Sequence, residues 1–124
     1  MIACDTSSFS AFLAGEAGED VEKLDFALRS RRIVLPAATL TEILSNPVTT
    51  PAAANIIAGC RVLEPDYGFW HRAAASRSKL IGLKLKARLA DALIAQSCID
   101  AGVELITRDR DFRHFAQHCG LKLA

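Results

Sequence analysis

Short apolar runs alternate along the chain with longer segments in which apolar side chains recur every three or four residues. The short runs are typical of buried strands, and we expect strands at Ile2–Cys4, Ile33–Leu35, Arg61–Leu63, Val103–Ile106 and, at the end, Leu121–Leu123. Between the runs, the helical period predicts helices around 9–13 and over 21–28, 39–44, 52–58, 67–83, 88–101 and 111–118. Proline or glycine marks several of the expected boundaries.

This regular alternation of strand and helix is typical of a mainly parallel sheet with helices on both faces. We therefore expect a three-layer α/β/α fold with a central sheet of four or five strands. The 124 residues fit one domain, which we place at 1–124. With 51% hydrophobic and 23% charged residues, the composition excludes a disordered tail, a collagenous repeat and a coiled coil.

The cysteines and the apolar runs bear on the compartment. The four cysteines are widely and irregularly spaced beside apolar residues: Cys4, Cys60, Cys98 and Cys119. This pattern favours reduced, mostly buried thiols over a disulfide framework or a zinc site. No apolar stretch approaches the roughly 18 residues of a transmembrane helix, and the start of the chain lacks a secretory pattern. We expect a cytoplasmic protein that does not cross a membrane.

Acidic residues stand where an α/β sheet binds its ligands, beyond the carboxyl ends of the strands. Asp5 ends the first predicted strand, and Asp109 follows the fourth. Glu42 and Asp91 lie among aliphatic residues of predicted helices, where a carboxylate is costly unless it is paired or bound to a cation. Four carboxylates that converge would repel one another, and Mg²⁺ or Mn²⁺ would relieve the repulsion.

Each acid taken singly also has an ordinary structural explanation. Asp5 and Asp91 could cap helices, Glu42 could face solvent, and Asp109 with Asp111 could form a turn and a cap. Asp5 could also be the phosphoacceptor of an aspartyl-phosphate phosphatase or receiver-type domain. Such phosphatases usually carry a second acid two residues later, where this chain has Ser7. The combination of all four acids favours a cation site.

The same segments resemble the signatures of a nuclease family. They are Asp5-Thr6-Ser7-Ser8-Phe9, Thr41-Glu42-Ile43, Asp91-Ala92-Leu93-Ile94-Ala95 and Thr107-Arg108-Asp109-Arg110-Asp111-Phe112. Together they look like the four motifs of PIN-domain nucleases. Length and element order resemble most the VapC-type toxins of bacterial toxin–antitoxin modules, and the resemblance covers essentially the whole chain.

The resemblance implies a Mg²⁺- or Mn²⁺-dependent endoribonuclease that hydrolyses RNA phosphodiester bonds with a metal-activated water. It also implies a cognate antitoxin as partner and a homodimer. A PIN-like module that binds RNA or a partner without catalysis is the alternative within the same fold. The presence of all four acids argues against that alternative.

Carried over position by position, the resemblance implies catalytic acids at Asp5, Glu42, Asp91 and Asp109. Asp5, Asp91 and Asp109 would bind the metal, and the hydroxyls of Ser7 and Thr107 would support them. Asp111 leaves two readings open, because it could replace Asp109 as the fourth acid or help to bind the metal through water. The spacing from Thr107 favours Asp109.

The net charge of +1 is the average of two opposed halves. Residues 1–66 hold 5 basic and 9 acidic side chains, a net of −4, whereas residues 67–124 hold 10 and 5, a net of +5. An acid-free stretch, Tyr67 to Ala90, leads directly into Asp91. Basic side chains beside a nuclease site bind phosphates, and the candidates for RNA contact are Arg77, Lys84, Arg88 and Arg108.

Three remaining side chains have competing interpretations. His114 and His118 have the spacing of a transition-metal pair or of a metal-free ribonuclease, but the apolar stripe of their helix predicts that both lie outside. Trp70, at the start of a predicted helix, is expected to pack inward.

Overall fold

The computed structural model describes all residues, 1–124, and contains four strands and seven helices. The strands are β1 (Ile2–Cys4), β2 (Ile33–Pro36), β3 (Arg61–Leu63) and β4 (Glu104–Ile106). The helices are α1 (Thr6–Leu13), α2 (Glu19–Arg29), α3 (Ala37–Ser45), α4 (Pro51–Ala58), α5 (Phe69–Gly82), α6 (Leu89–Ala101) and α7 (Phe112–Cys119).

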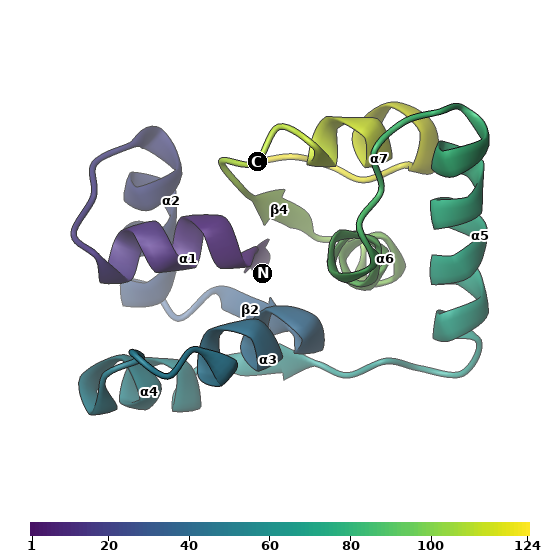
Figure 1. Ribbon diagram of the computed structural model, residues 1–124. Coiled ribbons are helices and arrows are strands. Elements are labelled where there is room, and N and C mark those ends of the chain that lie inside the picture. Colours follow the sequence, from purple (N-terminus) through teal and green to yellow (C-terminus); the bar gives the residue numbers. More distant parts are fainter.

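The four strands form one parallel sheet in the order β3-β2-β1-β4. In its register, Ile2 lies opposite Ile33 on one side and Glu104 on the other. The chain ends beside β4, but Leu123 makes only an isolated bridge to Leu105, so the fifth strand expected at the end does not form. Figure 1 shows α1 and α2 on one side of the strands and α5, α6 and α7 on the other, which confirms the three-layer α/β/α expectation.

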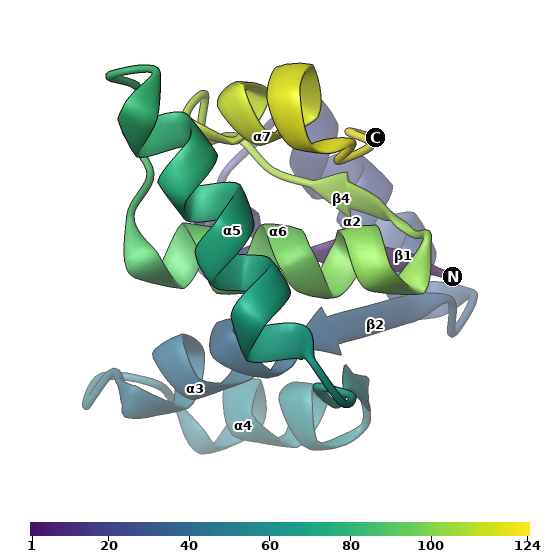
Figure 2. The ribbon, with the colours of Figure 1, turned by 90° about the vertical axis from the view of Figure 1, so that its right-hand side faces the viewer.

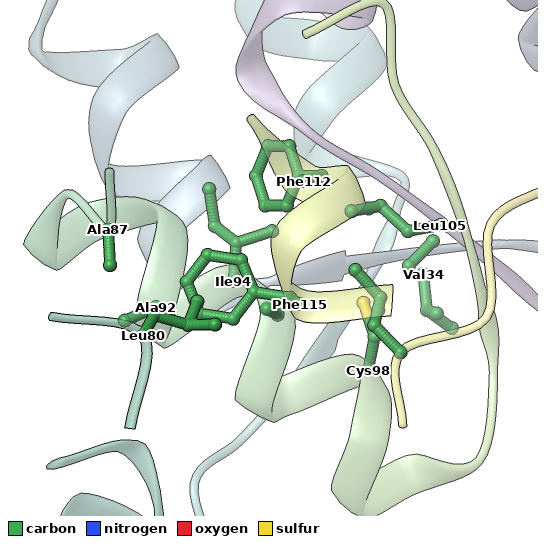
Figure 3. Packing of buried hydrophobic residues seen from close by; sticks show 12 residues of the cluster. Val34, Leu80, Ala87, Ala92, Ile94, Cys98, Leu105, Phe112 and Phe115 are labelled. Carbon is green, nitrogen blue, oxygen red and sulfur yellow. The ribbon is translucent and has the colours of Figure 1, made fainter. Parts of the chain in front are cut away.

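Two hydrophobic cores lie on opposite faces of the sheet because successive strand residues point to opposite sides. Val34 and Leu105 face α6 and α7, where they pack with Cys98, Phe112 and Phe115 (Figure 3). Their neighbours along the strands face the other way, into the core built by α1, α2, α3 and α4, and include Cys4, Leu35 and Ile106. The inner strands β1 and β2 are therefore largely buried, which explains why their runs are apolar without alternation, whereas the edge strand β3 is exposed at Arg61 and half-buried at Val62 and Leu63.

The α6 helix packs directly on the sheet and α5 packs outside it, so that α5 crosses in front of α6 in Figure 2. The middle of α6 is buried at every position from Ile94 to Cys98, including Gln96 and Ser97. It ends as expected at Gly102, whose φ of +66° suits glycine. None of the seven helices is both long and apolar enough to span a bilayer.

Several local expectations were wrong. Trp70 is 61% exposed, and its neighbour Phe69, 3% exposed, provides the aromatic anchor instead. The α3 helix begins at Ala37 rather than Thr39, directly after Pro36, which ends β2. The four thiols are free, as expected, although only Cys4 and Cys98 are fully buried.

Candidate metal centre

The carboxyl edge of the sheet brings together side chains that are far apart in the sequence. β1 is the interior strand from which the chain first moves to β2 and later returns to β4, so ligands are expected beyond the ends of β1 and β4. Asp5 follows β1 directly, and Thr107 follows β4. Asp91 enters from the first turn of α6. The fold thus forms a cluster of acids at this edge.

Asp5 is buried, with 2% of its surface exposed, and both of its carboxylate oxygens accept hydrogen bonds. Ser7 Oγ lies 2.7 Å from Oδ2 and 2.9 Å from Oδ1, and Thr107 Oγ1 lies 2.7 Å from Oδ2. The Ser8 N–H donates to Oδ1 at 3.1 Å, which makes Asp5 the N-cap of α1. Asp5 is therefore a cap and a member of the acidic cluster at once.

Opposing effects act on the pKa of Asp5. Burial raises the pKa, and the hydrogen bonds from Thr107, Ser8 and Ser7 oppose that rise, while the nearby charge of Asp109 adds to it. The net result is a raised pKa. A phosphoacceptor needs an accessible carboxylate, so the burial and bonding of Asp5 disfavour the phosphatase or receiver-type alternative.

Thr107 connects the two ends of the cluster. Its hydroxyl donates to Asp5 and accepts the N–H of Asp109 at 3.0 Å. Asp109 Oδ1 in turn accepts the N–H of Asp111 at 2.9 Å. These bonds fix the loop between β4 and α7 against the end of β1.

Asp91 differs from Asp5 because its Oδ2 is buried and has no hydrogen-bond partner. Burial raises the pKa of Asp91 to about 6, and the charges of Asp109, Glu42 and Asp5 add to the effect while Arg88 opposes it. A buried polar atom without a partner costs about 1–3 kcal/mol. A cation at this point would remove that cost.

Oxygens of Asp91, Asp109 and Asp111 lie within 4.8 Å of one another. A set of carboxylate oxygens suits hard divalent cations such as Mg²⁺ and Mn²⁺ and does not suit softer metals that favour sulfur or imidazole. The residues present therefore fit a divalent cation. Asp109 and Asp111 are both in the group, and Lys86 Nζ lies 3.4 Å from Asp111 Oδ2, an ion pair that the motif spacing does not reveal.

Glu42 lies at the rim of the cluster. It is exposed on α3, and its Oε1 accepts a hydrogen bond from Thr6 Oγ1 at 2.6 Å. Its charge still raises the pKa of Asp91, so it is near enough to act on the same ligand. His114 and His118 are partly buried on α7 and are not members of the acidic group.

The four basic candidates have different surroundings. Lys84 and Arg88 are exposed on the connection into α6, and neither side chain has a hydrogen bond or ion pair within the protein. Arg77 Nε donates to the Ala87 carbonyl at 2.8 Å, which fixes the same connection. Arg108 turns to the start of α2, where it pairs with Asp20. Of the four candidates, only Lys84 and Arg88 thus have side chains without a partner in the protein.

We predict that Mn²⁺ affinity rises steeply with pH up to about 6 and then levels, since the cation competes with a proton on Asp91. Below the pKa, one displaced proton weakens binding about tenfold per pH unit. Calorimetric titration with Mn²⁺ between pH 5 and 8 measures this. An affinity independent of pH across that range would contradict the placement of Asp91 at the cation.

Comparison with known proteins extends the description. The sequence matches the family model of the PIN domain over residues 2–117. None of the curated proteins matches it significantly. Among solved structures, the fold is similar to VapBC2 from Rickettsia felis bound to a DNA fragment from their promoter, with a TM-score of 0.70, 15% identity and coverage of 100% of this chain and 98% of that one.

Two further structures are similar over almost their whole length. DNA-bound VapBC from Salmonella typhimurium has a TM-score of 0.69 at 18% identity, covering 100% of this chain and 98% of that one. FitAcB from Neisseria gonorrhoeae has a TM-score of 0.67 at 18% identity, with coverage of 99% and 96%. Because the family model spans nearly the whole chain, from the first strand into the last helix, this protein belongs to the PIN-domain family.

Proposed function

We propose that this PIN domain is a divalent-metal-dependent endoribonuclease of the VapC type, the toxin of a toxin–antitoxin pair. The observation that carries the proposal is Asp91, whose Oδ2 is buried without a partner and whose carboxylate offers an oxygen within 4.8 Å of oxygens of Asp109 and Asp111. A non-catalytic module gains nothing from such a group, whereas a metal-dependent nuclease requires it. The similarity to VapBC structures supports the toxin assignment.

The side chains at this edge of the sheet would have different roles in the reaction. Asp91 and Asp109 would bind Mg²⁺ or Mn²⁺, with Asp111 directly or through water, and Asp5 would complete the site from the end of β1. The bound ion would lower the pKa of a water and neutralise the phosphodiester. Ser7 and Thr107 orient Asp5 by hydrogen bonds. Glu42, whose Oε1 accepts the Thr6 hydroxyl, would orient the attacking water.

The test is cleavage of single-stranded and structured RNA with Mg²⁺, Mn²⁺ or chelator. We expect cleavage only with the metals and products that carry a 5′-phosphate and a 3′-hydroxyl. Cleavage in the presence of chelator, or products with a 2′,3′-cyclic phosphate, would contradict metal-activated water as the nucleophile.

Lys84 and Arg88 are proposed to bind phosphates beside the cut, with Arg77 fixing the segment that carries them. We predict that the double variant Lys84→Gln/Arg88→Gln weakens RNA binding and flattens its salt dependence by about 1.4 in log–log slope, about 0.7 per contact. The matched control is Arg32→Gln/Arg61→Gln, which removes two exposed charges at the amino ends of β2 and β3. Equal slopes for the two double variants would refute the assignment. Filter binding of RNA without metal, at several salt concentrations, measures these slopes.

We propose that the antitoxin binds along a groove of about 460 Å³ between α1 and the α3–α4 region. Its lining is mixed, with apolar side chains that include Leu13, Ile43 and Val48 beside polar ones that include Glu42. An antitoxin segment with apolar side chains and one basic residue fits this surface. Co-purification with the product of the neighbouring reading frame, lost in Val48→Asp, tests the proposal.

A homodimer is proposed through the outer face of α5 and the start of α6. Trp70, Ile81 and Leu89 are 61%, 51% and 61% exposed and line an apolar groove of about 440 Å³. Such exposed apolar patches mark interfaces, and no acidic residue lines this groove. Light scattering should report a dimer that Ile81→Asp converts to a monomer.

The RNA substrate and the free thiols also fit the proposed cytoplasmic location.

A further inference from the structure

The guanidinium of Arg108 lies beside the acidic site but is directed at the α1–α2 connection. Its Nε is 2.8 Å from Asp20 Oδ2 and its Nη2 is 3.0 Å from Asp20 Oδ1, a two-pronged ion pair. Nη2 also donates to the Ala17 carbonyl at 3.2 Å, and Nη1 lies 3.4 Å from Glu16 Oε2. Little of its hydrogen-bonding capacity is left for a phosphate.

Asp20 in turn connects to the site through α1. Its Oδ2 accepts the Ser8 hydroxyl at 2.7 Å, and the Ser8 N–H donates to Asp5 Oδ1, the N-cap of α1. Thr107, which precedes Arg108, donates to the other oxygen of Asp5. The five residues therefore form a closed ring of covalent and hydrogen bonds around the carboxylate at the end of β1.

The glycine at position 18 leaves room for this ion pair. Gly18 has a φ of +153°, and a Cβ there would lie 2.5 Å from Asp20 Oδ1 and 2.8 Å from Arg108 Nη2. The side chains of Asp20 and Arg108 are 14% and 33% exposed, whereas those of the surface pair Asp25 and Arg29 are 40% and 76% exposed. The Arg108 hydrogen bonds also hold the pKa of Asp20 at about 2.

We propose that the Asp20–Arg108 ion pair is a positioning device that keeps the β4–α7 loop, with Thr107 and Asp109, in register with Asp5. The inference rests on the proposed function of this edge as a divalent-metal site. It replaces the expectation that Arg108 contacts RNA. Asp20 touches no acid of the cluster, so both members of the pair are positioning residues and not catalytic ones.

The experiment measures Mn²⁺ affinity by calorimetry at pH 7.5 for the wild type, Asp20→Asn, Arg108→Gln and the double variant. Loss of a residue that orients metal ligands costs 10–100-fold in affinity or activity. Because Asp20 and Arg108 act through Ser8 and the loop, we expect about a tenfold loss for each single variant and no further loss for the double. Asp25→Asn, on the same helix, is the control and should bind Mn²⁺ like the wild type.

Two further readouts separate positioning from other roles. In RNA cleavage, the variants should need more Mn²⁺ for half-maximal rate but recover the wild-type kcat at saturating metal. RNA affinity in chelator should be unchanged. Gly18→Ala, which removes no charge but displaces the ion pair, should weaken Mn²⁺ binding in the same direction even if one of the other variants unfolds.

The possible results distinguish a failure of this inference from a failure of the proposed function. Wild-type Mn²⁺ affinity in both single variants, or additive losses in the double, overturns the inference and leaves the nuclease proposal standing. Weaker RNA binding in Arg108→Gln with unchanged Mn²⁺ affinity also overturns it and returns Arg108 to the RNA contacts. If the wild type binds Mn²⁺, the variants lose it as expected and no RNA is cut, the inference stands and the proposed function fails.

Discussion

Asp91→Asn is expected to abolish RNA cleavage and at the same time to stabilise the metal-free protein. The loss of activity should be at least about 10³-fold, since the proposed metal site would lose a charged ligand. The gain in stability follows from the unpartnered, buried Oδ2, which is ionised at neutral pH at a cost in free energy. Solvent screening at this partly exposed position leaves about 1–2 kcal/mol of stabilisation.

The pH dependence of that gain has a definite sign. The folded-state pKa of Asp91, about 6, lies above the ordinary value of 3.8, so the folded protein binds this proton more tightly than the unfolded one. The contribution of Asp91 to the free energy of unfolding therefore falls as pH rises from about 4 to about 6. The difference between variant and wild type should be small at pH 4 and complete above pH 6.

Urea denaturation in chelator, at several pH values, measures this difference. Asp100→Asn is the matched control on the same helix, because hydrogen bonds from Arg72 and Gln96 outweigh the effect of burial and lower the pKa of Asp100. That variant should be destabilised or unchanged. Added Mn²⁺ should stabilise the wild type far more than Asp91→Asn. Destabilisation of the Asp91 variant without metal would contradict the unsatisfied state of its carboxylate.

Asp5→Asn is the second large effect, and it has the opposite consequence for stability. The carboxylate accepts bonds from two hydroxyls and the Ser8 N–H, and an amide nitrogen in place of either oxygen would face donors. We expect a loss of about 1–3 kcal/mol in the free energy of unfolding. Cleavage should be lost as in the Asp91 variant, since Asp5 belongs to the proposed metal site.

Thermal and urea unfolding with a cleavage assay measure both consequences. Ser10→Ala, at an exposed position of the same helix, should leave stability and cleavage unchanged. A fully active Asp5→Asn protein would exclude Asp5 from the site and leave it only the role of a helix cap. The two substitutions are thus expected to change the free energy of unfolding in opposite directions. The fold supplies hydrogen bonds to both oxygens of Asp5 but leaves Oδ2 of Asp91 without a partner.

Much of the fold was predictable because local pattern and packing agree. The four strands and the helices between them follow from the apolar runs and the helical periods, whereas the strand order β3-β2-β1-β4 is known only from the structure. Trp70 was mispredicted because aromatic residues favour the core on average, and only packing decides which of Phe69 and Trp70 turns inward. At the end of the chain, the segment Leu121–Leu123 forms only an isolated bridge, from Leu123 to Leu105, and not a strand.

The gathering of Asp5, Asp91 and Asp109 follows from where strands end and α6 begins. The partners of the charged side chains around these acids do not follow from the sequence. The pairing of Arg108 with Asp20 spans 88 residues, and neither motif spacing nor charge count indicates it. The unsatisfied oxygen of Asp91 is likewise a property of three-dimensional packing, and a sequence can mark the residue without revealing its missing partner.

The parallel pairing of β1 with β4 determines when the proposed metal site can form during synthesis of the chain. Asp5 and the hydroxyl that fixes it, on Thr107, are separated by 102 residues. At 5–20 residues per second, a translating ribosome takes about 5–20 seconds to make the second after the first. Until then the central strand lacks a neighbour and the acids cannot converge. A nascent or truncated chain that lacks β4 and Thr107 therefore cannot assemble the proposed metal site.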